Sequence, residues 1–265
     1  MQTTREPTVL PIARRPSPCT ARRVLVIDVG GSHVKCLATG AAQPREFKSW
    51  RDMTAEQMAA RVMELVQGWS YDVVTIGYPG AVDDNKPAHD PHNLGPAWRG
   101  FDFERVFARP VKVINDSAMQ AYGAYRGGRM LFLGLGTGLG SALIVDGTLV
   151  PLELAHLPYK KHDTYEDRVG KLGLERFGQK KWRREVLRVI ELFRLALLPE
   201  YIVLGGGNAK RIDNPPPDVG LVDNSAAFTG GFRLWDPEWT SQAQPRFPSA
   251  RATADKNDLA RTDHG

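Results

Sequence analysis

Residues 130–150 read MLFLGLGTGLGSALIVDGTLV, and this stretch decides the fold. Apolar runs on either side of Gly136-Thr137-Gly138-Leu139-Gly140 predict two strands joined by a glycine-rich turn. A plain hairpin turn needs only two residues, such as Asn-Gly. The additional glycines indicate a backbone that must lie close to another group, and phosphate is one candidate because free amides bind anions.

A second stretch of the same kind, VLVIDVGGSHVKCLATG, covers residues 24–40. It predicts a buried strand over 24–28, a glycine turn and a second strand over 34–38. The turn places Gly30 and Gly31 between the carboxylate of Asp28 and the side chains of Ser32 and Lys35. These groups can bind phosphate and a hydrated Mg²⁺. An ordinary hairpin with a charged turn is the alternative interpretation.

Strands and helices alternate along the rest of the chain, which is typical of the α/β class. A helix is predicted over 54–67, because Thr54 and Gln57 have the spacing of a capping box. Further strands are expected within 45–50, 72–82 and 110–115, and a last buried strand followed by a glycine turn within 201–207. Helices are expected from about 117 and over 225–235. Residues 179–201 carry an apolar stripe at helical spacing, expected to face the core or a second subunit: Val186, Leu187, Ile190, Phe193, Leu197 and Leu198.

Bulk composition restricts the class of protein. A chain of 265 residues that is 42% hydrophobic can bury a substantial core. It has no apolar run long enough to span a membrane, and its two cysteines, Cys19 and Cys36, cannot form a disulfide framework or a zinc cluster. The arginine-containing first residues lack an apolar segment, so we expect no secretory signal. We therefore expect a cytoplasmic protein with no membrane partner.

The net charge of +5 arises mainly outside the folded part. Residues 1–23 contain five Arg and one Glu and are too rich in Pro, Thr and Arg to pack. This tail effect argues against a nucleic-acid partner. Within the folded part, residues 159–188 hold ten Lys or Arg against five Asp or Glu, a local excess that bears on the substrate.

Seven motifs occur in a fixed order across residues 24–235: VIDVGGSHVK, IGYPGAV, HNLGPAWRG, VINDSAMQA, LGLGTGLGSALIVDGTLVPLELAH, YIVLGGGNAK and LVDNSAAFTGG. Together they resemble the sugar kinase and actin superfamily, in detail the ROK family, and most of all its polyphosphate glucokinase branch. The resemblance implies an α/β, two-lobed actin-like/hexokinase (ribonuclease H-like) sugar kinase fold with an interlobe cleft. The expected parts are a disordered tail at 1–23, a small lobe at 24–115, a larger lobe at 116–235 and a loose tail at 236–265.

The resemblance further implies a glucokinase that uses Mg²⁺, takes inorganic polyphosphate as donor with ATP left open, and forms a homodimer. Asp116 falls at the position of the catalytic base. From the residues alone, Asp116 could instead cap the following helix, a role worth ~1 kcal/mol, although Ser117 could also serve as the cap. As a base it would accept the proton of the sugar's 6-hydroxyl.

The remaining site residues follow from the same resemblance. The sugar would contact Gly80, Asn93, Asn115, Asp116, Glu153, His156 and Glu166. The phosphates would contact Asp28, Gly30, Gly31, Ser32, Lys35, Gly136, Thr137, Gly138, Gly205, Gly206 and Gly207, with Asp28 as the metal ligand. Trp98 could stack on the sugar, but a core position is favoured.

The basic excess offers a track for a long polyanion, which gains from charge steering and counterion release. We expect it to consist of Lys160, Lys161, Lys180, Lys181, Arg183 and Arg184. A solvated helix face is the alternative interpretation of the same charges.

The chain also departs from the family pattern. Ala155 stands where the family has a glycine, which would be strained if the backbone there needed positive φ. The Cys/His zinc motif of the wider family is absent, and the N-terminal tail leaves no room for a winged helix-turn-helix. Two other functions remain open: an ATP-dependent hexokinase acting on mannose or glucosamine, and a catalytically silent sugar- or polyphosphate-binding protein.

Overall fold

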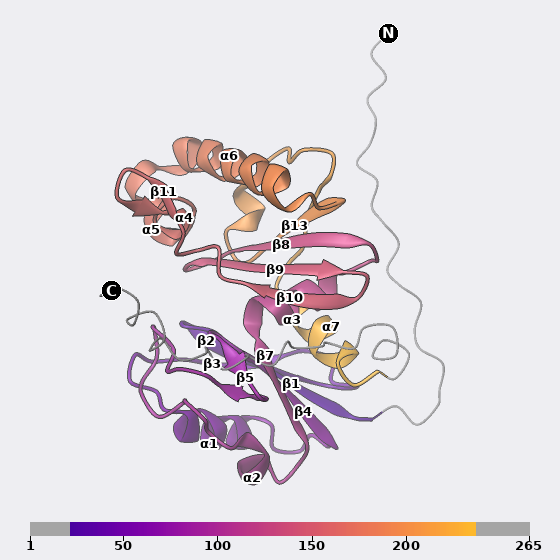
Figure 1. Cartoon of the computed structure of the whole chain (residues 1–265). Coiled ribbons are helices and arrows are strands. Elements are labelled where there is room, and N and C mark those ends of the chain that lie inside the picture. Colours follow the sequence, from indigo (N-terminus) through magenta and orange to yellow (C-terminus); the bar gives the residue numbers. More distant parts are fainter. Residues whose placement is uncertain (1–21, 237–265) are drawn as a thin grey trace, which may run out of the picture.

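A computed structural model describes residues 22–236 of the chain as two stacked lobes, each built on a five-stranded sheet (Figure 1). Almost all of the two expected tails lies outside these residues. Arg23, at the edge of the first tail, is held by Asp72, whose carboxylate accepts hydrogen bonds from the Arg23 backbone and guanidinium. No helix in the described part of the chain is both long and apolar enough to cross a membrane.

The first sheet has the order β3-β2-β1-β4-β7. Strands β1 (Val24–Val29), β2 (His33–Ala38) and β3 (Arg45–Lys48) form an antiparallel meander, and β4 (Val73–Tyr78) and β7 (Val111–Asn115) run parallel to β1. Helices α1 (Ala55–Leu65) and α2 (Phe103–Phe107) cover the outer face. A small hairpin of β5 (Val82–Asp83) and β6 (Lys86–Pro87) completes this lobe.

The second sheet has the order β10-β9-β8-β13-β14. Strands β8 (Arg129–Leu135), β9 (Leu139–Val145) and β10 (Thr148–Leu152) form a meander, which the glycine-rich stretch predicted, and β13 (Tyr201–Gly205) and β14 (Val219–Leu221) are parallel to β8. The hairpin of β11 (Pro158–Lys160) and β12 (Asp163–Thr164) leads to α4 (Tyr165–Val169), α5 (Lys171–Phe177) and α6 (Gln179–Leu197) on the outer face. A short 3-10 helix follows β13 at Ala209–Arg211.

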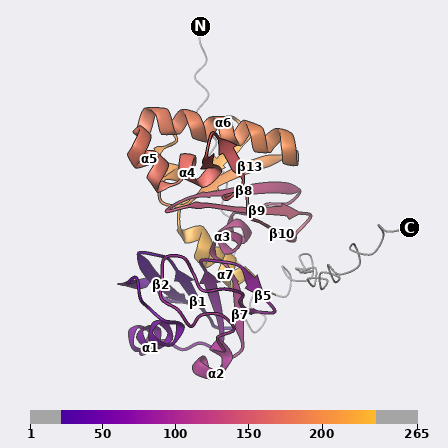
Figure 2. The ribbon, with the colours of Figure 1, turned by 60° about the vertical axis from the view of Figure 1, so that its left-hand side comes forward.

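Two helices lie between the sheets, α3 (Asp116–Ala124) and α7 (Ser225–Arg233), as both views show (Figure 2). They pack so closely that a Cβ on Gly123 would lie 1.8 Å from the Ala226 carbonyl oxygen, and one on Gly230 would lie 1.8 Å from that of Met119. Because no side chain fits between them, the glycines allow the two backbones to touch. The last helix thereby holds α3 in place between the lobes.

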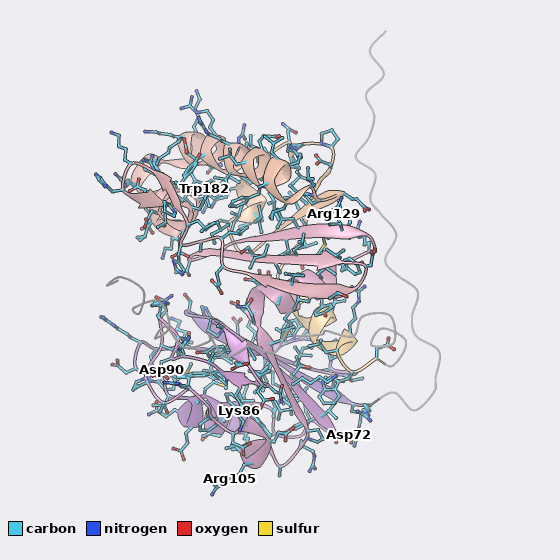
Figure 3. The ribbon with its side chains drawn as sticks, in the orientation of Figure 1. Asp72, Lys86, Asp90, Arg105, Arg129 and Trp182 are labelled. Carbon is cyan, nitrogen blue, oxygen red and sulfur yellow. The ribbon has the colours of Figure 1, made fainter. Side chains whose placement is uncertain are left out.

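Most of the apolar residues that were predicted to face the core are buried. Trp182 anchors α6 in the second lobe (Figure 3): it is fully buried, and its indole donates a 2.8 Å hydrogen bond to the Val169 carbonyl. Trp98 is fully buried too, as expected, and donates to the Met53 carbonyl. Leu198 lies just after α6, as its C-cap in a left-handed conformation, and is 64% exposed, so it is not part of the core.

Candidate functional site

The site is built around the junction of β7 and α3, where Asn115 ends the strand and Asp116 starts the helix. Asn115 is the N-cap, because its Oδ1 accepts a 3.0 Å hydrogen bond from the Ala118 amide. Its Nδ2 donates to the Gly80 carbonyl at 3.1 Å, which ties the start of α3 to the loop after β4. Asp116 therefore does not cap the helix, and its carboxylate is available for chemistry.

The Asp116 carboxyl group has an altered acidity. The pKa of Asp116 is raised to about 7, chiefly by burial between the lobes and then by the charges of Asp28 and Glu153, while hydrogen bonds from Ser117 act in the opposite direction. A base is most effective when its pKa lies near the working pH. A carboxyl group with this pKa can accept or release a proton near neutral pH.

Asp28 lies near the end of β1, paired in register with Lys35 on β2 and Gly77 on β4. Burial raises its pKa to about 6, and the charge of Lys35 opposes that shift. The Lys35 ammonium nitrogen lies 3.9 Å from Oε2 of Glu46. Within the described residues, no group donates a hydrogen bond to the Asp28 carboxylate, so both of its oxygens can serve as ligands.

Magnesium at phosphoryl-transfer sites is typically bound by one or two carboxylates together with the substrate's phosphates. A single unengaged carboxylate at Asp28 fits that ligand set. In residues 22–236, no three His, Cys, Asp or Glu side chains gather to hold a metal ion by themselves. The residues present therefore suit a cation that arrives with the phosphate donor.

The first glycine hairpin presents two free amides. The Gly30 amide bonds to the His33 carbonyl at 2.9 Å, whereas the amides of Gly31 and Ser32, in residues 22–236, have no such partner. Ser49 fixes the loop from outside, because its hydroxyl donates to the Gly30 carbonyl and its amide to the Ser32 carbonyl. No motif in the sequence indicates this role of Ser49.

The second hairpin repeats the arrangement. The Gly136 amide bonds to the Gly138 carbonyl and the Leu139 amide to Oε2 of Glu166. The amides of Thr137 and Gly138 have no partner in the described part of the chain, and Thr137 is exposed. Each hairpin thus offers two adjacent amides that can bind phosphate oxygens.

The third glycine turn lies against the second hairpin. The Gly206 backbone takes a φ of 79°, and a Cβ there would come within 2.6 Å of the Leu135 carbonyl oxygen. Asn208 joins the two segments, because its amide and side chain donate to the carbonyls of Leu135 and Gly136. Open space surrounds Gly207. The turn at Gly205, Gly206 and Gly207 therefore lies beside the second hairpin, as a shared donor site requires.

The segment after β10 supplies the other predicted sugar residues. Glu153 and His156 are exposed, and the charge of Glu153 is felt at Asp116. Glu166 has one carboxylate oxygen engaged with the second hairpin, and its amide donates to the Ala155 carbonyl. Ala155 is buried and does not have a positive φ, so replacing the family's glycine causes no backbone strain.

The loop between β6 and α2 brings further residues to the site. Asn93 packs against Gly31, whose added Cβ would lie 3.3 Å from the Asn93 Cβ. His92, which the sequence analysis did not single out, lies edge-on to His156 of the other lobe, with ring centroids 6.3 Å apart. Its position beside Asn93 in the HNLG motif was the available signal.

The expected track residues fall into two groups. Lys160 and Arg183 form ion pairs of 2.6 Å with Glu185 and Asp213, which neutralise them. Between residues 159 and 188, the exposed cations for which the structure shows no ion pair are Lys161, Lys180, Lys181 and Arg184 of the expected track, together with Arg188. The Phe177 ring lies under three cationic groups, those of Arg168, Arg176 and Lys181, each within 4.9 Å of its centroid.

Comparison with known sequences finds a family match for part of the chain. Residues 24–151 match the sequence model of the ROK family. Polyphosphate glucokinase of Mycobacterium tuberculosis strain H37Rv is 29% identical over 231 residues, covering 79% of this chain and 85% of the relative. Polyphosphate glucokinase of Mycobacterium leprae is 26% identical over 235 residues, covering 77% and 72%.

Solved structures show the same two-lobed fold. The inorganic polyphosphate/ATP-glucomannokinase of Arthrobacter sp. strain KM superimposes with a TM-score of 0.68 at 26% identity, covering 80% of this chain and 97% of the other. A ROK family glucokinase from Streptomyces griseus, in complex with glucose and AMPPNP, gives a TM-score of 0.64 at 18% identity, covering 80% and 99%.

Proposed function

Because residues 24–151 form a ROK family domain, we propose that this protein is a glucokinase that transfers the terminal phosphoryl group of inorganic polyphosphate to the 6-hydroxyl of glucose. One observation carries the proposal. The Asp116 carboxylate lies at the start of the helix between the lobes, has no capping role, and has a pKa of about 7. A structural carboxylate at a helix start would be expected to cap the helix or to pair with a cation.

In the proposed reaction, the sugar's 6-oxygen attacks the terminal phosphorus of the donor. The bond between that phosphorus and the bridging oxygen breaks, and the shortened polyphosphate leaves. The hydroxyl proton passes to Asp116, a step that typically contributes ~10²–10⁴-fold to the rate. Magnesium held by Asp28 would neutralise phosphate charge. The free amides at Gly31, Ser32, Thr137 and Gly138 would hold the donor in line.

The sugar would be held by groups from both lobes. Asn93 and the Gly80 backbone belong to the first lobe, and Glu153, His156 and the free oxygen of Glu166 to the second. The side chain of Asn115 has partners at both ends, so its contribution is mainly to fix Gly80 relative to α3. Because groups of both lobes would bind the sugar hydroxyls, sugar binding would draw the two lobes together.

The preference for polyphosphate rests on the start of α6. Lys180, Lys181 and Arg184 lie in its first two turns, and no acidic residue occupies the first turn. Cations at this end of a helix oppose the helix dipole and typically cost ~0.3–1 kcal/mol each. A bound polyanion would offset that cost, whereas a solvated face needs no such arrangement. ATP could use the same hairpins, with its nucleoside near Gly205, Gly206 and Gly207.

The direct test is the formation of glucose 6-phosphate by the purified full chain with Mg²⁺ and either long-chain polyphosphate or ATP. Turnover on polyphosphate that falls steeply with salt supports the proposal. Turnover with ATP but not with polyphosphate would support the sugar kinase activity and contradict the proposed preference for polyphosphate. Activity only with mannose or glucosamine would change the acceptor, and silence with every sugar would favour a binding protein.

A triple variant tests the donor surface. Replacing Lys180, Lys181 and Arg184 by Gln is expected to lower kcat/KM for long-chain polyphosphate at least tenfold and to leave ATP turnover within twofold. The matched control removes three exposed cations from the first lobe, where Figure 3 shows two of them: Lys86, Arg105 and Arg109. Equal losses in both triple variants would mean that only net charge matters.

A further inference from the structure

The chain places a serine directly after the proposed base, and its side chain contacts the second glycine hairpin. Ser117 donates two hydrogen bonds to Oδ1 of Asp116, from its amide at 2.7 Å and from its hydroxyl at 3.4 Å. No other group in the described residues donates to this carboxylate. Oδ2 therefore remains open to accept a proton.

The hydroxyl of Ser117 is enclosed by the hairpin. Gly134 and Gly140 are cross-strand partners at the base of the β8–β9 hairpin. A Cβ on Gly140 would lie only 1.8 Å from Ser117 Oγ, and one on Gly134 would lie 3.5 Å away. The two glycines thus leave a notch in the sheet, and the serine side chain fills it.

Helix capping does not explain this serine. Asn115 already caps α3, so the Ser117 hydroxyl is not needed to satisfy the first turn. Alanine would suffice at a helix position that only packs against glycine. A hydroxyl wedged between the proposed base and the proposed donor hairpin instead links the two groups that the reaction must align.

We propose that Ser117 is a positioning residue, whose hydroxyl holds Oδ1 of Asp116 and fixes the base relative to the hairpin that binds the phosphate donor. The inference rests on the proposed function. It assigns to Gly134 and Gly140 a role distinct from phosphate contact, because they make room for the serine. Orientation of this kind affects the chemical step more than substrate binding.

The acidity of Asp116 provides a readout that a purely structural role would not move. Burial is the largest cause of the raised pKa of Asp116. Among neighbouring groups, Asp28 on β1 and Glu153 after β10 also disfavour the charged form, and Ser117 favours it. Ser117→Ala removes one of the two Ser117 hydrogen bonds that stabilise the charged carboxylate. The effects that disfavour the charged form remain. The pKa of Asp116 should rise in Ser117→Ala.

The experiment compares the full-length protein with Ser117→Ala, after circular dichroism and thermal melting have shown that both fold. We expect kcat to fall about tenfold, KM for sugar and donor to stay within twofold, and the acid limb of the kcat profile to move to higher pH. Ser225→Ala is the matched control: that serine also donates from its amide and hydroxyl to a nearby aspartate, Asp223, but at the exposed start of α7.

Carboxyl ¹³C NMR of the metal-free protein, assigned with Asp116→Asn, measures the Asp116 titration without any need for activity. A higher Asp116 pKa in Ser117→Ala supports the inference even if no sugar is phosphorylated, so failure of the proposed function is separable. An unchanged titration and an unchanged kcat would overturn it. A rise in donor KM alone would also overturn it, because the hydroxyl would then bind phosphate.

Discussion

The indole of Trp235 donates a 2.9 Å hydrogen bond to the hydroxyl of Thr75, which lies 160 residues earlier in the chain. Thr75 is fully buried in the middle of β4, and its hydroxyl donates in turn to the Gly231 carbonyl of α7 at 2.8 Å. The ammonium of Lys112, on β7, bonds to the Leu234 carbonyl and lies 4.5 Å from the Trp235 ring. These contacts hold the end of α7 against the first sheet.

Thr75→Val tests the strength of this connection. The substitution keeps the shape but leaves the Trp235 indole and the Gly231 carbonyl without their partner, a loss of ~1–3 kcal/mol. We expect the free energy of unfolding, measured with urea, to fall by that amount. Thr229→Val, an exposed position on α7, should change it by less than ~0.5 kcal/mol. Equal effects would show that the buried hydroxyl has no special role.

Two glycines of the second hairpin should respond differently to alanine. A Cβ on Gly138 would lie 2.0 Å from Oε2 of Glu166, whereas one on Gly136 meets nothing within 4 Å. Gly138→Ala should therefore displace the Glu166 carboxylate, break its hydrogen bond with the Leu139 amide and lower the free energy of unfolding by ~0.5–1.5 kcal/mol. Gly136→Ala should leave it unchanged or slightly raised. A similar loss for both would contradict this explanation.

Asp116→Asn should separate activity from stability. Glucose phosphorylation is expected to fall by ~10²–10⁴-fold. The folded-state pKa of about 7 lies above the ordinary aspartate pKa of 3.8, so Asp116 destabilises the fold progressively as the pH rises between those values. The variant should be more stable than the wild type at pH 8, and this advantage should disappear at pH 4. Chemical unfolding at both values tests the sign, and a variant less stable at pH 8 would contradict it.

The histidine pair connects the lobes at the site. Because His92 faces His156, its removal should weaken sugar binding by groups of the second lobe. We expect His92→Ala to raise KM for glucose several-fold, with a smaller change in kcat. His89→Ala, an exposed histidine in the same loop, is the control. If the two variants had the same KM for glucose, the proposed role of His92 in the sugar site would be contradicted.

Most individual elements were predictable because their signals are local. The capping box at Thr54 and Gln57 is present, with α1 starting at Ala55, and the predicted helix near Ser117 starts one residue earlier. Prediction failed where an element depends on distant contacts. Residues 201–207 were expected to hold the last buried strand and a glycine turn, and β13 covers the first five of them, but β14, a mostly exposed three-residue strand that pairs with β13, was not predicted.

The candidate site was predictable in composition but not in detail. Glycines, Asp28 and Asp116 stand out in the sequence, whereas their partners do not. Asn115, Asp116 and Ser117 are all preferred N-cap residues, so the local sequence does not choose among them, and the choice of Asn115 depends on β7 pairing with β4 as far as that residue. The neutralisation of Lys160 by Glu185 likewise requires the hairpin and α6 to meet. Charge counts along the sequence therefore overstated the free basic surface.

The contacts of Gly138 and Gly140 limit how this hairpin can vary. Glu166 occupies the space beside the first and Ser117 the space beside the second, so each glycine is specified by a residue elsewhere in the chain. The loop is consequently not a portable motif that would bind phosphate when grafted onto another sheet. In related sequences, a side chain at position 140 should appear only together with a smaller residue at 117, as a coupled substitution.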